Sequence, residues 1–273
     1  MCAFIPMPMP ATSELVLAVF MSAAAGLVGS VAVMRRMSLA SDALSHVALP
    51  GIALALLLHF SPMLGGFVAL IVGTLIVWAL EYRTRIPTEA VIGVIFSAAL
   101  AVGSLIASGE DLLDALLGVP GRTEVLETAF GLVAAALVVV FMIRARSSLV
   151  IRLVSPDLVR TLGVSVPRLD LLFLMSFALT VALGLRYLGV LLMGSLIIIP
   201  GTTGMYLGRS LRSMQIVSVA SAIGSTLLGT LIAARVGIAS GPAVIAVAAS
   251  VFFASLFVRR RGRRTMLPAS SQR

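Results

Sequence analysis

Residues 35–51 read RRMSLASDALSHVALPG and lie between two apolar stretches, one ending near Met34 and the other running to about Leu58. Within this segment Asp42 and His46 are four residues apart, so on a helix they share one face with Cβ atoms about 6 Å apart. A carboxylate and an imidazole placed in this way can meet one small cation. Ionisable groups so close to hydrocarbon are costly, which favours a functional role for the pair.

Pro50 adds a backbone oxygen to this group. Proline has no N–H for the carbonyl four residues back, so the oxygen that it frees belongs to His46. Because Gly51 follows, we expect a kink, which a membrane tolerates only inside protein or beside water. We place Ser45 in the same predicted metal pathway as Asp42 and His46. The structural alternatives stay open: Asp42 can cap a helix, His46 can be an interior histidine with a hydrogen bond, and Pro50 can simply bend the chain.

Composition indicates an integral membrane protein. Of 273 residues, 60% are hydrophobic and only 11% are charged, whereas about 25% are charged in soluble domains. Several stretches of about 20 residues carry no charge, enough for a helix to cross a ~30 Å hydrocarbon core. We expect an all-α, polytopic membrane helix bundle that forms one domain over residues 1–273, and eight or ten spans stay open beside nine. The nine expected spans are 14–34, 43–58, 63–80, 90–107, 126–143, 170–185, 187–206, 214–233 and 241–258.

The net charge of +9 comes entirely from arginine, because the chain contains no lysine. A phosphate loop of the type G-x-x-x-x-G-K-[ST] needs that lysine, so we expect any ATP hydrolysis to belong to another chain. We therefore expect that this chain is not an enzyme. We also do not interpret its positive charge as a sign of a nucleic-acid partner. The single cysteine, Cys2, excludes an intrachain disulfide and a cysteine cluster for zinc. The absence of H-E-x-x-H disfavours an intramembrane metalloprotease.

Arginine bias between the expected loops predicts the orientation, because short cytoplasmic loops carry an excess of positive charge. Of the 20 basic residues, only Arg122, Arg186 and Arg235 fall on one side of the expected spans. The sequence therefore predicts an outer N-terminus and a cytoplasmic C-terminus. The basic tail, residues 259–273, is expected to lie near anionic lipid.

A short helix with both ends defined by sequence is predicted on the cytoplasmic side. Ser155 suits the N-cap, Pro156 the first helical position and Asp157 the positive end of the helix dipole, while Gly163 suits the C-terminal stop. Seven helical residues span only ~10 Å, too short to cross a bilayer. We expect this element to press against another protein, with an idle surface turn as the alternative. It comprises Ser155, Pro156, Asp157, Leu158, Val159, Arg160, Thr161, Leu162 and Gly163.

The seventh expected span, 187–206, contains Pro200 followed by Gly201, and we expect the helix to be broken there. Hydroxyls and glycines beside such a break can satisfy freed backbone groups and allow close helix packing. This span is expected to line the pathway without a charge of its own.

Together these stretches resemble the membrane-spanning permease subunit of the ABC importers for zinc, manganese and iron. Residues 41–51 are similar to that family's G-D-A-[LI]-S-H-A-x-L-P-G segment, with Ser41 where glycine is usual. Residues 155–164 resemble its coupling segment D-x-E-x-A-x-x-x-G. Residues 191–203 are similar to L-L-x-x-A-L-L-I-I-P-A-A-x-A, and residues 240–242 to the S-G-P before its final helix.

The resemblance implies a homodimeric pore in a bacterial cell membrane and ATP-driven import of a divalent transition metal. It also implies cytoplasmic ATPase subunits seated on residues 155–163 and an extracellular metal-binding protein that delivers the ion. Asp42 and His46 would contact the travelling metal, and zinc, manganese and iron all suit this ligand pair. No permanently bound cofactor is expected. A transporter or channel driven by an ion gradient, and an ABC permease for a siderophore, stay open.

Overall fold

The computed structural model describes residues 12–38, 40–84, 86–106, 125–161, 163–188 and 190–264, and within these ranges all regular structure is helical. Eight described stretches are long and apolar enough to cross a membrane, and Met193–Leu207 is a shorter apolar helix. The predicted all-α membrane bundle is therefore confirmed. The helices are α1 Thr12–Met34, α2 Ala40–Val47, α3 Leu49–Leu57, α4 Pro62–Thr84, α5 Thr88–Ile106, α7 Val125–Val154, α8 Pro156–Thr161, α9 Val166–Leu188, α10 Val190–Leu207, α11 Leu211–Val236 and α12 Ser240–Arg264.

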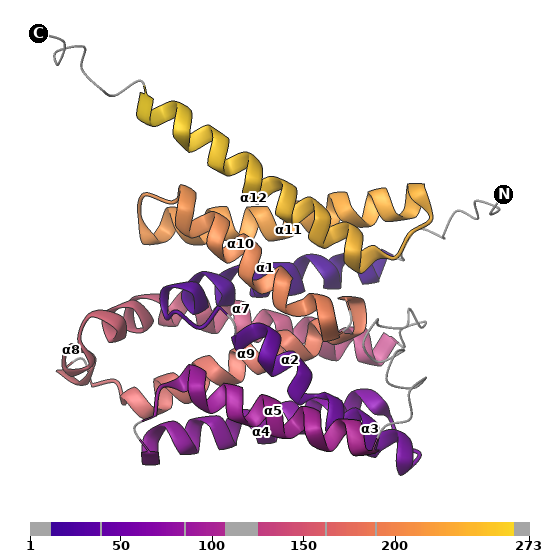
Figure 1. The fold of residues 1–273 in the computed structure, drawn as a ribbon. Coiled ribbons are helices and arrows are strands. Elements are labelled where there is room, and N and C mark those ends of the chain that lie inside the picture. The colour runs from indigo at the N-terminus through magenta and orange to yellow at the C-terminus, as the bar shows by residue number, and fades with distance from the viewer. Residues whose placement is uncertain are drawn as a thin grey trace, which may run out of the picture.

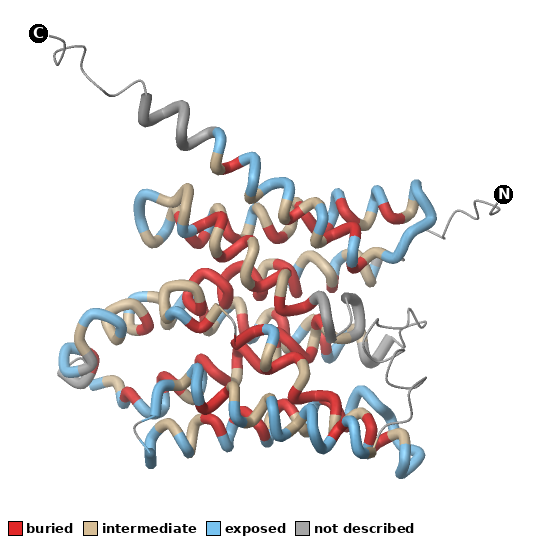
Figure 2. Tube along the Cα trace, in the orientation of Figure 1, coloured by how far each residue is buried: buried red, intermediate tan, exposed pale blue. Residues whose placement is uncertain are grey.

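The long helices lie side by side and α2 lies within the bundle (Figure 1). Helix α1 packs against α10 and α11, α11 also packs against α12, and α3 pairs with α4. Helix α2 contacts α10 on one side and α5 on another, with α4 and α9 nearby. The predicted metal-pathway residues therefore lie where several spans meet, and the buried positions concentrate in the same central region (Figure 2).

Helices α1 and α9 form much of the core, because most of their apolar residues are buried. Phe173 and Phe177 of α9 pack edge to face and are fully buried together with Met142 of α7. Most residues of α5 and α7, by contrast, remain accessible in the single chain. These apolar outer faces suit contact with lipid, which is as apolar as the side chains that they present.

The predicted short second span consists of two helices, α2 and α3, separated at Ala48. The N–H of Ala48 donates to the carbonyl of Ser45 at 3.3 Å, and the N–H of Ile52 donates to the carbonyl of Ala48 at 3.0 Å. Pro50 lies in the first turn of α3, where a missing N–H costs nothing. The interruption therefore precedes the proline, and α2 is a separate helix of eight residues.

Pro200 does not interrupt its helix, contrary to the sequence-based expectation. Helix α10 continues through Pro200 to Leu207. A Cβ on Gly201 would lie 2.6 Å from the carbonyl carbon of Gly29, so the backbones of α10 and α1 are in close contact at this point. Packing against neighbouring helices lets membrane proteins keep a proline inside a helix, which explains the difference.

Candidate functional site

Helix α2 carries the predicted metal-pathway residues. Asp42 and His46 both lie within it, one turn apart; Asp42 is exposed and His46 is half-buried. Ser45 is buried, and its hydroxyl donates to the carbonyl of Asp42 at 2.7 Å. That proton is therefore committed to the backbone, and the carboxylate and the imidazole are the groups of α2 best suited to bind a cation.

The His46 ring has one nitrogen without a hydrogen bond among the described residues. Its Nδ1 atom is buried and has no hydrogen-bond partner among the described residues. Its ring centroid lies 5.5 Å from that of Phe96 in α5, with the two planes tilted by 58°. A buried polar atom without a partner calls for an explanation, and an imidazole nitrogen of this kind can accept a proton or a metal.

One chain does not supply a complete set of ligands in its described part. No group of three or more His, Cys, Asp and Glu side chains comes together there in a way that could hold a metal ion. The pair on α2 therefore offers two strong ligands at most. Further ligands would have to come from backbone oxygens, from water or from another chain.

Close backbone packing fixes the position of α2. A Cβ on Gly194 of α10 would lie 2.9 Å from Asp42 Cα, and the Ser41 hydroxyl donates to the Gly194 carbonyl at 3.3 Å. On another side Gly73 of α4 leaves room for Val47. Helix α2 is thus held by its fit between α10 and α4, while its acidic side chain stays accessible.

Gly51 has a packing role as well as its predicted place beside a bend. A Cβ on Gly51 would overlap the carbonyl oxygen of Gly65 in α4. The backbones of α3 and α4 touch at this point, as small residues allow at helix crossings in membranes. This contact anchors the chain just after the metal-pathway helix.

The predicted short helix is α8, at one end of the bundle and well separated from α2 (Figure 1). Asp157 and Leu158 are exposed and Val159 is fully buried. Gly163 has φ +75°, and the N–H of Val164 donates back to the carbonyl of Val159 at 3.4 Å. Glycine tolerates this left-handed conformation at a helix end, so the chain reverses sharply after α8. Leu162 lies outside the described residues.

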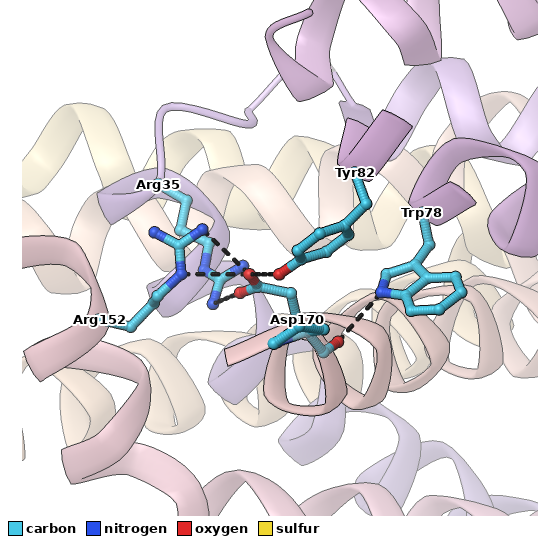
Figure 3. A network of polar contacts seen from close by, with 6 residues as sticks. Arg35, Trp78, Tyr82, Arg152 and Asp170 are labelled. Atoms are coloured by element: carbon cyan, nitrogen blue, oxygen red, sulfur yellow. Dashed lines mark hydrogen bonds and ion pairs between the residues drawn. The ribbon is translucent and has the colours of Figure 1, made fainter. Parts of the chain in front are cut away.

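A buried ionic cluster centred on Asp170 was not predicted. Asp170 lies in the first turns of α9, and its side chain is 1% exposed. Its Oδ1 forms an ion pair with Arg35 at 2.9 Å, and its Oδ2 accepts from Arg152 Nε at 3.1 Å and Nη2 at 3.0 Å. The Tyr82 hydroxyl also donates to Oδ2, at 2.9 Å. The α1–α2 connection, α4, α7 and α9 thus meet at one carboxylate (Figure 3).

Neighbouring contacts hold the cluster in place. The Arg35 guanidinium lies 4.3 Å from the centre of the Phe173 ring, and Trp78 Nε1 donates to the Pro167 carbonyl at 3.0 Å. Burial lowers the pKa of Arg35, and the charge of Asp170 opposes that effect. A cleft of about 240 Å³ lies beside the cluster, with Arg35, Glu81 and Arg152 in its lining.

The sequence held a signal for this cluster. Asp170 is a lone carboxylate near the start of a long apolar stretch, and such residues usually have a partner inside the protein. The orientation rule treats Arg35 and Arg152 only as basic residues on one side of the membrane. A search for the partner of Asp170 would have raised the question, but the sequence gives no distance between residues 35, 152 and 170.

The model of the ABC 3 transport family matches residues 11–259. The chain belongs to this family. This match confirms the resemblance to the permease subunits of metal ABC importers, and it covers α2, α8 and the Asp170 cluster.

Two curated relatives from Haemophilus influenzae are equally similar to the chain. It is 30% identical over 246 residues to the high-affinity zinc uptake system membrane protein ZnuB. This alignment covers 85% of this chain and 91% of ZnuB. It is also 30% identical over 251 residues to a probable iron transport system membrane protein, covering 89% and 92%. Both names concern metal uptake, and this chain is a multi-pass membrane protein of the same family. Their equal identities do not distinguish zinc from iron.

A solved structure shows the same architecture. PsaBC from Streptococcus pneumoniae in complex with Fab aligns with a TM-score of 0.76 and 26% sequence identity, covering 90% of each chain. The described helices therefore share the fold of this solved structure.

Proposed function

We propose that this chain is the membrane-spanning subunit of an ATP-driven importer for zinc, manganese or iron as divalent ions. The carrying observation is the pair on α2: an exposed Asp42 carboxylate one turn from a His46 ring whose buried Nδ1 has no partner among the described residues. In this proposal the two side chains contact the ion in transit, and Ser45 lines the same stretch. Gly51 holds α3 in backbone contact with α4 just after this stretch.

Two copies of the chain form the pathway in this proposal. One α2 helix supplies two ligands, and the described residues of one chain gather no group of three. Two copies would supply two carboxylates and two imidazoles, which matches the four-coordinate preference of zinc. Manganese and iron also accept oxygen and nitrogen ligands, so this set does not select among the three metals. The absence of cysteine from α2 disfavours a soft copper(I) site.

A separate cytoplasmic ATPase docks on α8 in this proposal. The helix is short, it presents an exposed Leu158, and both of its ends are set by the sequence. The absence of lysine supports a hydrolysing partner over a phosphate loop in this chain. Helix α12 ends at the same end of the bundle as α8 (Figure 1), which fits a cytoplasmic C-terminus with its basic tail 259–273. The N-terminus is then outside, where a metal-binding protein delivers the ion.

Metal uptake by cells tests the role of the pair. We expect Asp42→Asn and His46→Ala to reduce uptake of radiolabelled zinc, manganese or iron, whichever the wild-type chain imports, in a strain without its own importer. Loss of one good ligand weakens capture by roughly 10- to 100-fold, by analogy with partners that orient metal ligands. Uptake is normalised to the amount of permease in the membrane.

Two controls make the result specific. His59→Ala changes the only other histidine, which lies in the turn between α3 and α4, and it should leave uptake near the wild-type value. Undiminished uptake in both α2 variants contradicts the assignment of the pair. Uptake by the purified chain in liposomes without any ATPase would instead favour a channel or a gradient-driven transporter.

A further inference from the structure

The Asp170 cluster lies across the two chain segments that flank α8. Arg152 is in the last turn of α7, three residues before Ser155, and Asp170 is in the first turns of α9. Among the described elements, helix α8 makes its main contacts with these two helices. A force applied to α8 therefore reaches the bundle through α7 and α9, and the Arg152–Asp170 contact ties these helices together beside it.

A second arm of the cluster leads to α2. Arg35 directly follows α1 and precedes α2 by only five positions. The N–H of Arg36 donates to Val33 and the N–H of Met37 to Ala32, and Arg36 has φ +60°. These are the two bonds of a Schellman helix end, formed here without glycine. Residues 35–37 are therefore tightly folded, and Arg35 is separated from the start of α2 by only four residues.

Helix α4 offers a parallel route. Tyr82 and Trp78 attach it to α9, through the Asp170 carboxylate and the Pro167 carbonyl. Farther along, Gly73 of α4 packs directly against Val47 at the end of α2. Both ends of the metal-pathway helix are thus connected to the same carboxylate, one through Arg35 and the other through α4.

The ionic contacts of the cluster also have room to rearrange. Asp170 pairs with both Arg35 and Arg152, and Glu81 lies with the two arginines in the lining of the adjoining cleft. Arg152 is 27% exposed and lines the adjoining cleft, so its side chain has room to change partner. A buried ion pair is weak evidence for stability as such, because desolvation offsets much of the attraction. Its sensitivity to geometry suits it to a positioning role.

We propose that Asp170 transmits a displacement of α8 to α2. It does so through its contact with Arg152 near α8 and its contact with Arg35 near α2. The three residues are positioning residues: they act through α2 and do not touch the metal. This inference rests on the proposed function, since it assigns the route between the ATPase seat and the metal-pathway pair.

The test compares transport with hydrolysis in the assembled importer. The permease is purified with its ATPase and reconstituted in liposomes with the delivering protein, and the ions imported per ATP hydrolysed are measured with the metal that the wild type takes up. We expect Arg152→Gln to lower this ratio by at least about fivefold, the lower end of typical coupling between sites. ATP hydrolysis and the amount of bound ATPase should persist, because α8 itself is unchanged.

Conservative variants separate coupling from folding. Arg152→Lys keeps the charge and should restore part of the ratio, while Arg144→Gln removes an exposed arginine from the same helix and should leave it unchanged. If Arg152→Gln does not assemble, Tyr82→Phe removes one hydroxyl donor to Asp170 and should give a smaller fall. A merely structural role would lower transport and hydrolysis together, in proportion to the folded complex.

The outcomes distinguish the two proposals. Suppose that the wild-type complex transports metal only with ATP, and that Arg152→Gln and Tyr82→Phe leave the number of ions imported per ATP unchanged. This result overturns the proposed role of Asp170 and leaves the proposed function standing. A wild-type complex that hydrolyses ATP without importing zinc, manganese or iron overturns the proposed function itself.

Discussion

Helix α2 and the Asp170 cluster hold their ionisable groups under opposite conditions. Asp42 is exposed and the buried Nδ1 of His46 has no partner among the described residues, whereas Asp170 is 1% exposed and has three side-chain partners. A pair with free coordination can take up an ion and release it. A buried carboxylate that contacts two guanidiniums and a phenol hydroxyl instead positions its neighbours. The exposure of a charged group and the partners that it already has therefore indicate its task better than its presence near hydrocarbon does.

Removal of each carboxylate in turn is expected to give the largest difference in stability between the two regions. We expect Asp170→Ala to lower the free energy of unfolding by about 3–5 kcal/mol, because it leaves Arg35 and Arg152 without their buried counter-charge. Asp42→Ala should change it by no more than about 0.5 kcal/mol, as expected for an exposed side chain. Unfolding of the detergent-solubilised protein is followed by circular dichroism. The single tryptophan, Trp78, gives a second signal beside the cluster.

Equal losses in the two variants would contradict the comparison. So would a stable Asp170→Ala protein, since it would mean that water already screens the two guanidiniums. Asp170→Asn is a useful intermediate, because it keeps the size of the side chain and removes only the charge.

Much of the fold was predictable because it depends on local composition. Uncharged stretches long enough to cross a membrane identify the helices, and Gly163 marks the end of α8 through a requirement of its own backbone. The continuity of α10 through Pro200 was not predictable in this way. It depends on how closely the backbone of α1 approaches at Gly29, which is a property of the packed bundle.

The candidate site was predictable only in part, for a related reason. Asp42 and His46 are neighbours on one helix, so their spacing in sequence gives their arrangement in space. Arg35 and Asp170 are 135 residues apart and meet only through the packing of α1 against α9. Hydropathy and helix signals report on each span separately, so they carry no information about which charged residues of different spans meet.

A smaller effect on stability is expected where α2 packs against α10. A Cβ on Gly194 would lie within 3.0 Å of the backbone of Asp42, so Gly194→Ala forces the two helices apart. We expect a loss of about 1–3 kcal/mol in the free energy of unfolding, as for other overpacked sites, together with reduced metal uptake because α2 is displaced. Gly224→Ala is the matched control, since nothing lies within 4 Å of its added Cβ. Normal uptake by Gly194→Ala would show that the position of α2 matters less than its side chains.

The smallest effect is expected from the neutral contact beside the cluster. Trp78→Phe removes the indole N–H that donates to the Pro167 carbonyl but keeps an aromatic ring between α4 and α9. A single neutral hydrogen bond contributes about 0.5–1.5 kcal/mol, and this one is exposed, so the loss should lie near the lower end of that range. Circular dichroism on heating measures it independently of the missing tryptophan. If Trp78→Phe destabilises the protein as much as Asp170→Ala, neutral contacts and packing hold α4 to α9. The Asp170 cluster would then not be the main contact that holds these helices together, contrary to what its burial and its ion pairs indicate.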